Sequence, residues 1–255
     1  MNRYLPPITK NLLIVNVIMF VAAWFLQTKG IYLDVVFASF FPLSPNFHWY
    51  QIISHMFMHG GWTHLFFNMF ALWMFGSAVE QAFGAKKFLI LYFVSGLGAF
   101  VLFNLMNFWE YKQTVDYLTS NGTPLYDVVE YAKFNIHREY LGANAWMQTL
   151  PSGTDMTAAE GFFNFLTSPM LGASGAICGV LAAFGVLFPD SVIMLIFPPI
   201  PLKAKYFIPL YILLELYLSF QQAQGDNVAH LAHVGGAVFG FFLARYWIRN
   251  RYRWN

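Results

Sequence analysis

A hydroxyl and an imidazole that could form a nucleophile–base pair lie beside two glycine stripes of the chain. Ser174 is followed by glycines one and five residues later, and His233 is followed by Gly236 and Gly240. Small residues at such spacings let two helices pack backbone against backbone. A histidine on one stripe could then reach a serine on the other, as activation of a serine nucleophile requires.

A second polar cluster could supply hydrogen-bond donors to a developing negative charge. His64 and Asn68 are four residues apart and therefore share one face of a helix. An imidazole N–H and a side-chain amide are suitable donors for the oxyanion of a tetrahedral intermediate. His55 and His59 have the same spacing and precede a Gly-Gly break. Each group taken singly would more often only cross-link helices, but their combination with Ser174 favours chemistry.

Two histidines compete for the role of the base. His230 is followed three residues later by His233, whereas His233 is followed three residues later by Gly236. Only His233 is therefore in register with the glycine stripe, and we predict that it is the base. His230 would lie about one helical turn outward, at the rim of the site.

The composition indicates a membrane protein. Of the 255 residues, 58% are hydrophobic and only 10% are charged, whereas a soluble domain carries about 25% charged residues. This argues against a soluble enzyme, and the lone Cys178 argues against a disulfide scaffold. The chain lacks the basic patch of a nucleic-acid-binding protein, so we expect no nucleic-acid partner. The remaining class is a polytopic protein of the lipid bilayer.

Six apolar stretches reach or approach the roughly 20 residues that a membrane-spanning helix needs. They cover residues 11–27, 62–83, 88–109, 169–188, 205–221 and 227–248. Residues 110–168 contain turn signals and no such stretch, so we predict an extracytoplasmic insert between the third and fourth spans. We expect one or two short helices in it, for example around 125–140. Residues 31–60 are broken by Pro42 and Pro45 and are expected to be interfacial or re-entrant. The predicted fold is an all-α, six-transmembrane helical bundle that forms one domain, residues 1–255.

Positive charges predict the orientation of this bundle. With the N-terminus inside, the inner side would hold ten Lys and Arg residues and the outer side four, which is the asymmetry typical of cytoplasmic loops. We therefore expect both termini in the cytoplasm. Ser174 follows Pro169, the expected start of the fourth span, by five residues and would lie roughly 8 Å below the outer surface.

Other interpretations of the polar residues are possible. Imidazole is the commonest metal ligand, but neither histidine pair has a neighbouring Cys or carboxylate, so we expect no metal and no cofactor. A channel or transporter would need polar groups through the whole bilayer, whereas these lie near one side. Glu215, in the fifth span, is expected to face a polar cavity or to be neutral, and we assign it no catalytic role.

In combination, these motifs resemble those of the rhomboid intramembrane serine proteases. The resemblance covers about residues 11–110 and 165–248. The matching motifs are His55-x3-His59-x4-His64-x3-Asn68, Glu80 at the inner end of the second span, Gly172-x-Ser174-Gly175, and His233-x2-Gly236-x3-Gly240. Each motif is weak alone, but their order on the second, fourth and sixth spans is specific.

The resemblance implies a catalytic Ser174–His233 dyad without a third, acidic member. It implies that His64, Asn68 and the backbone N–H of Ser174 form an oxyanion hole. The supporting residues would be His59, His55, Gly172, Gly236 and Gly240. The chain departs from the family at Cys178, where an aromatic side chain is common; burial in apolar surroundings argues against this thiol as the nucleophile.

The resemblance also implies how a substrate would reach the site. The fifth span would be the mobile wall for substrate entry, and residues 221–227 would cap the site. The expected activity is hydrolysis of peptide bonds in or near transmembrane segments of membrane proteins. The first alternative is a catalytically inactive relative that binds membrane helices, and the second, less favoured, is a His-rich metal-binding membrane protein. We expect a multi-pass protein of a bacterial inner membrane whose site opens to the outer side.

Overall fold

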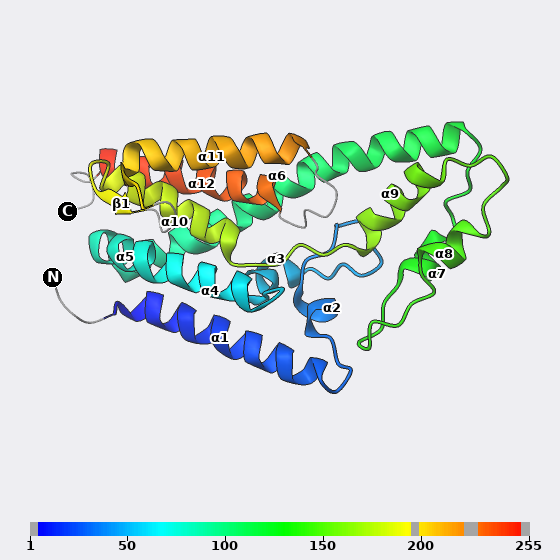
Figure 1. The fold of residues 1–255 in the computed structure, drawn as a ribbon, viewed down its shortest axis with the longest axis horizontal. Coiled ribbons are helices and arrows are strands. Elements are labelled where there is room, and N and C mark those ends of the chain that lie inside the picture. Colours follow the sequence, from blue (N-terminus) through cyan, green and yellow to red (C-terminus); the bar gives the residue numbers. More distant parts are fainter. Residues whose placement is uncertain (1–4, 195–198, 222–228, 251–255) are drawn as a thin grey trace. The chain divides into compact units, whose positions relative to one another are not determined.

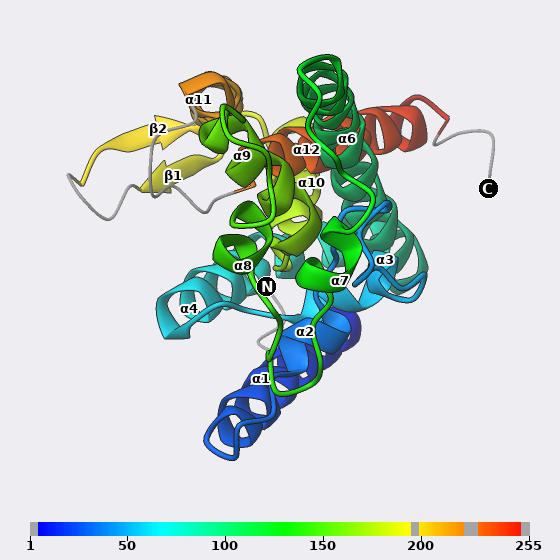
Figure 2. The same ribbon diagram turned by 90° about the vertical axis from the view of Figure 1, so that its right-hand side faces the viewer.

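Helices make up nearly all of the regular structure (Figure 1). The structure is a computed structural model that describes residues 5–194, 199–221 and 229–250. Within these residues the only strands are β1 (Val192–Met194) and β2 (Pro201–Lys203), an antiparallel pair in which Ile193 lies opposite Leu202 (Figure 2). The prediction of a helical protein is therefore correct at this level.

The chain divides into two compact units. Unit 1 comprises Met1–Ile18, His59–Phe103 and Gly172–Asn255, and unit 2 comprises Met19–Met58 and Asn104–Leu171. The helices α1 (Pro7–Gln27) and α6 (Ala85–Ser120) each contribute residues to both units. All residues of the predicted site except His55 belong to unit 1.

Unit 1 contains the helices that carry the candidate residues. They are α4 (Trp62–Ala71), the π-helical turn η2 (Leu72–Gly76), α5 (Ser77–Phe83), α10 (Ser174–Leu187), α11 (Ala204–Gln221) and α12 (His230–Arg249). The second predicted span begins at Trp62 and ends at Phe83 as expected, but η2 interrupts its α-helical pattern. The fifth predicted span corresponds closely to α11.

Two of the predicted helix boundaries differ from the structure by five residues or more. The third predicted span ends at residue 109, whereas α6 continues without a break to Ser120. The fourth was expected to start at Pro169, whereas α10 begins at Ser174. Ser174 is thus the first residue of its helix and does not lie one turn within it, so the depth calculated from Pro169 does not apply.

Three helices of the described residues are long and apolar enough to cross a membrane: α1, α6 and α12. The helix α10 is apolar but has only 14 residues. The structure thus supports a membrane-spanning chain, and the full set of six spans stays a prediction.

A buried carboxylate fixes the start of α1 within unit 1. Glu80 of α5 accepts hydrogen bonds from the backbone N–H groups of Ile8 and Thr9, at 2.9 and 2.7 Å, and from the Thr9 hydroxyl at 2.7 Å. The first N–H groups of a helix have no partner within the helix, and the helix dipole favours an anion there. Glu80 therefore binds the N-terminus of α1 to the end of the second predicted span.

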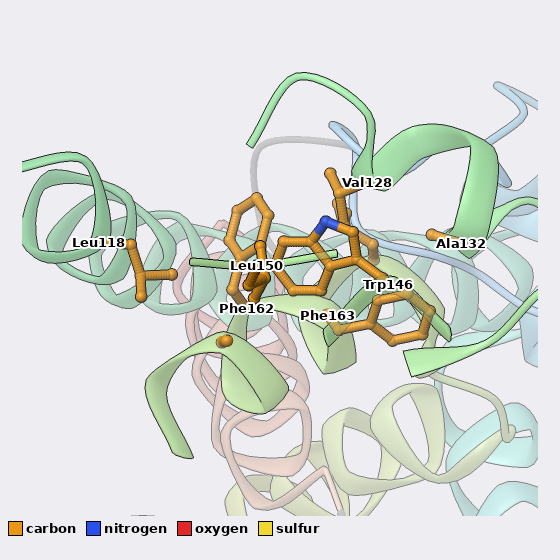
Figure 3. Packing of buried hydrophobic residues seen from close by; sticks show 9 residues of the cluster. Leu118, Val128, Ala132, Trp146, Leu150, Phe162 and Phe163 are labelled. Carbon is orange, nitrogen blue, oxygen red and sulfur yellow. The ribbon is translucent and has the colours of Figure 1, made fainter. Parts of the chain in front are cut away.

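Unit 2 has a hydrophobic core of its own, built around Trp146 (Figure 3). Its short helices are α2 (Leu33–Phe37), α3 (Gln51–Ser54), η1 (His55–Phe57), α7 (Val128–Ala132), α8 (Ala143–Met147) and α9 (Met156–Thr167). Trp146 is completely buried, packs against Phe162 and Phe163, and donates its indole N–H to Asp127 at 3.2 Å. The predicted insert thus contains three short helices and not one or two, and the expected helix at 125–140 is limited to α7.

The start of α9 shows how the insert sequence specifies a local element. Asp155 is the N-cap of α9, and its carboxylate accepts from the backbone N–H groups of Thr157 and Ala158. The bond from Ala158 and one from the Tyr117 hydroxyl lower the pKa of Asp155. An ionised acid is a favourable cap because it satisfies free N–H groups at the positive end of the helix.

Segments before and within the insert are joined in unit 2. Ser39 pairs with Met170 in an isolated β-bridge, and the amide of Asn46 donates to the Ala132 carbonyl at 2.9 Å. The backbone N–H of Phe134 donates to Asn46 Oδ1 at 2.9 Å. The first loop and the insert therefore pack together, which no local signal in the sequence predicts.

Candidate active site

The helices α10 and α12 lie side by side (Figure 1). Their backbones come into close contact at the glycines of both helices. A Cβ atom on Gly236 would overlap the carbonyl of Gly175, and one on Gly240 would overlap the carbonyl of Gly179. No other residue type fits at these two positions of α12 without moving the helices apart. The glycine stripes thus allow the side chains at the ends of the two helices to meet.

The structure brings Ser174 and His233 into direct contact. The Nε2 atom of His233 lies 2.8 Å from Oγ of Ser174. His233 is buried, and Ser174 is half-buried at the N-terminus of α10. This distance is within the reach that proton transfer from a hydroxyl to an imidazole requires. The register argument that favoured His233 over His230 agrees with this geometry.

A carboxylate that the sequence motifs do not include lies on the other side of His233. Oε2 of Glu215, on α11, is 2.7 Å from Nδ1 of His233 and 2.7 Å from Nδ1 of His230. The Glu215 side chain is only 8% exposed. Glu215 thus contacts two histidines of α12 directly, whereas the polar cavity expected from the sequence stays a prediction. The arrangement implied by the resemblance, a dyad with no acid beside it, does not describe this contact.

His64 lies beside Ser174, over Gly172. A Cβ atom on Gly172 would be 2.9 Å from both Cε1 and Nε2 of His64 and 3.4 Å from Oγ of Ser174. Both side chains therefore border the same small space. Gly172 also has φ = +125°, a conformation that other residues rarely adopt. The backbone N–H of Gly60 donates to Nδ1 of His64 at 3.4 Å, which leaves Nε2 to carry the proton and point into this space.

Asn68 provides a second donor on the face of α4 that also carries His64. Its side chain is buried, and Nδ2 has no hydrogen-bond partner among the residues that the structure describes. Leaving a buried amide unpaired costs about 1–3 kcal/mol. Such a donor is consistent with a site that a developing oxyanion would occupy. The backbone N–H of Ser174 is in the first turn of α10, where N–H groups lack partners within the helix.

The two remaining predicted histidines occupy different places. His59 is buried, and its ring centroid is 5.1 Å from that of His64. His55 belongs to unit 2, where its Nδ1 lies 2.8 Å from the carbonyl of Gln51. Burial lowers the pKa of His55 to about 4, so this imidazole is neutral at physiological pH. His59 thus lies beside His64, and His55 makes its contact within unit 2; their supporting roles stay predictions.

One group of side chains could ligate a metal ion within the described part of the chain. The ligand atoms of Glu215, His230 and His233 lie within 4.8 Å of one another. These are not the histidine pairs that the sequence suggested for a metal. Hydrogen bonds already join the three side chains.

The predicted cap at 221–227 lies almost entirely outside the described residues.

The match to a protein family covers the helices that carry Ser174, His233, His64 and Asn68. The Rhomboid domain model matches residues 46–115 and 134–250. The chain therefore belongs to the rhomboid family and, with its long apolar helices, is an integral membrane protein. The resemblance inferred from the motifs is thus confirmed.

Two relatives show the range of this similarity. The chain is 30% identical over 223 residues to an uncharacterized mitochondrial rhomboid protein of Schizosaccharomyces pombe, with 83% of this chain and 55% of the relative covered. It is 28% identical over 208 residues to the rhomboid protease AarA of Providencia stuartii, with 81% of this chain and 59% of the relative covered. The chain thus spans a little over half the length of these relatives. They come from a bacterium and from a mitochondrion.

Proposed function

We propose that this protein is an intramembrane serine endopeptidase that cleaves membrane proteins in or near their transmembrane segments. The observation that carries the proposal is the 2.8 Å contact between Oγ of Ser174 and Nε2 of His233. The similarity to the rhomboid protease AarA supports it. Ser174 would be the nucleophile and His233 the general base, held together by the glycine packing of α10 and α12.

The reaction follows from the positions of these groups. His233 takes the hydroxyl proton while Oγ of Ser174 attacks a backbone carbonyl carbon of the substrate. Donors from His64, Asn68 and the Ser174 backbone N–H stabilise the resulting oxyanion. The imidazolium returns its proton to the leaving amine, and water then hydrolyses the acyl-enzyme. An α-helix has its carbonyls hydrogen-bonded, so the substrate segment must unwind before attack.

The proposal includes an arrangement in the membrane. The six predicted spans place both termini in the cytoplasm and Ser174 toward the outer side, according to the distribution of Lys and Arg. The membrane would be a bacterial inner membrane. The substrate would approach past α11, and the insert would lie on the outer side. The proposal requires no cofactor, because the nucleophile, base and donors are all protein groups.

Cleavage of a transmembrane peptide in liposomes tests the proposed function. Ser174→Ala and His233→Ala are each expected to reduce turnover by roughly 10⁴-fold or more, because the two residues act as one unit. Ser152→Ala, in an exposed turn of the insert, is the matched control and should cleave like the wild type. A fluorophosphonate that reacts with activated serines should label the wild type and Ser152→Ala but not Ser174→Ala.

Two results would overturn the proposal. Wild-type turnover by Ser174→Ala would show that Ser174 is not the nucleophile. A wild type that neither cleaves the peptide nor reacts with the fluorophosphonate would favour the inactive, helix-binding alternative. A chelator should leave turnover unchanged. Loss of turnover in the presence of the chelator would instead favour a metal at Glu215, His230 and His233.

A further inference from the structure

We infer that Glu215 is a positioning residue that orients His233 and fixes its tautomer, so that the site works as Ser174–His233–Glu215. The inference rests on the proposed function, since it assigns Glu215 a role in the same reaction. It adds an acid that the sequence resemblance did not imply. It also adds a third helix, α11, to the two that carry the nucleophile and the base.

The two nitrogens of His233 face different partners. Nδ1 lies 2.7 Å from Oε2 of Glu215, and Nε2 lies 2.8 Å from Oγ of Ser174. An ionised carboxylate can only accept hydrogen bonds, so Nδ1 carries the proton. A neutral imidazole has one N–H, so Nε2 is left with its lone pair toward the serine hydroxyl. Glu215 thus selects the tautomer in which His233 can act as a base.

The charge of Glu215 would also act during the reaction. When His233 accepts the Ser174 proton it becomes an imidazolium 2.7 Å from the carboxylate oxygen. The Glu215 side chain is 8% exposed and that of His233 11% exposed, so little water weakens their attraction. The carboxylate therefore stabilises the positive charge that forms only after proton transfer, which is the kind of interaction that raises kcat.

His230 holds the carboxylate from a second direction. His230 and His233 are three residues apart on α12 and share a helix face, and both Nδ1 atoms lie 2.7 Å from the same oxygen of Glu215. Two donors on one oxygen fix the position of this oxygen more firmly than one. His230 thus has a place in the arrangement although sequence register excluded it as the base.

Contacts of α11 support this part of the site further. Cys178, one turn after Ser174, packs in a small cluster with Ala182 and Ala237, against which Tyr211 of α11 also packs. The Tyr211 hydroxyl lies 3.9 Å from Sγ of Cys178. Tyr211 and Glu215 are four residues apart and share one face of α11. This face therefore contacts both α10 and α12, and the alignment of His233 depends on α11 remaining packed there.

Substitution of Glu215 tests the inference with two readouts. Glu215→Gln keeps the shape but removes the charge, and its amide can donate to Nδ1 and stabilise the wrong tautomer. We expect kcat on a transmembrane peptide in liposomes to fall by roughly 10²- to 10⁴-fold with little change in KM. Glu215→Asp keeps the charge with a shorter reach and should retain at least about tenfold more turnover than Glu215→Gln. The matched control is Glu160→Gln, an exposed acid of α9.

The tautomer of His233 gives a readout that does not require activity. In protein labelled with ¹⁵N-histidine, the His233 signal, identified by its absence from His233→Ala, should show Nδ1–H in the wild type. Glu215→Gln should shift it toward Nε2–H, while Glu160→Gln should not. Melting temperatures in detergent show whether each variant is folded. If Glu215→Gln is unfolded, the wild-type signal still tests the inference, because a wild type with Nε2–H on His233 would overturn it.

The outcomes separate this inference from the proposed function. The role of Glu215 alone would be overturned if Glu215→Gln had wild-type kcat and an unchanged His233 tautomer while the wild type was active and Ser174→Ala inactive. Turnover of Glu215→Gln equal to or above that of Glu215→Asp would also overturn it, because a purely structural role depends on shape. If the wild type is inactive, the proposed function fails and the ¹⁵N signals still decide whether Glu215 orients His233.

Discussion

Gly172 offers a sharp test of how the backbone positions the site. A Cβ atom at this residue would lie 2.9 Å from Cε1 and Nε2 of His64, whereas carbon atoms in contact are about 3.5–4.0 Å apart. In Gly172→Ala the imidazole of His64 must therefore move by roughly 0.6–1 Å. The φ of +125° at Gly172 adds strain of about 1–3 kcal/mol for a residue with a side chain.

The expected result of Gly172→Ala is loss of catalysis with Ser174 and His233 both present. Displacing one oxyanion donor costs roughly 10²- to 10³-fold in kcat. The assay is cleavage of a transmembrane peptide in liposomes. Gly153→Ala is the control, because Gly153 also has a positive φ (+94°) but nothing lies within 4 Å of its Cβ position. The control should lose some stability and keep its turnover. A Gly172→Ala variant with kcat within about threefold of the wild type would refute the placement of His64 at the oxyanion.

Three further substitutions test contacts outside the reacting groups. Glu80→Ala removes the acceptor of three hydrogen bonds at the start of α1 and should lower the free energy of unfolding by about 3 kcal/mol; an unchanged melting temperature in detergent would contradict this. His55 has a folded-state pKa of about 4 against 6.5 unfolded. Its contribution to the free energy of unfolding is therefore fully present above pH 6.5, and about 3 kcal/mol of it should be lost as the pH drops to 4. His55→Asn should flatten this pH dependence of the melting temperature, and equal slopes would refute the assignment. Trp146→Ala should destabilise the core of unit 2 by about 3–5 kcal/mol, seen as faster hydrogen exchange in α9, and unchanged protection would argue against that core.

Apolar length and glycine spacing predicted much of unit 1. The limits of the second predicted span agree with the structure. The contact between Ser174 and His233, the histidine in register with Gly236, also agrees with it. These features follow from local sequence, because a spanning helix needs a run of apolar residues and close helix packing needs small ones. The start of α10 was missed because the positive φ of Gly172 delays the helix, and apolar content does not show this.

The length of α6 was missed for a related reason. Apolar content falls after residue 109, but the helix continues because Tyr111, Val115 and Leu118 form a new apolar stripe that packs on the core of unit 2. Apolar content alone marks only the part of a helix that can cross a membrane. The helical spacing of these three side chains is the signal in the sequence for the extension beyond residue 109.

Glu215 shows what sequence alone could not assign. It is separated from His233 by 18 residues and lies on another helix, so no local spacing connects them. The available signal was an acid within an apolar span of a chain that also places two histidines on the next helix. An ionised carboxylate inside a membrane needs a partner, and only the packing of α11 on α12 shows which one.

The π-helical turn η2 determines which side chains of the second predicted span face inward. Asn68 and Glu80 are both buried although they are 12 residues apart, which would separate them by about 120° around a regular α-helix. A π turn accommodates one extra residue, and this reduces the separation to roughly 20°. Deleting one residue from Leu72–Gly76 should therefore restore a regular helix with both side chains still inward, whereas inserting one there should turn either Asn68 or Glu80 toward lipid.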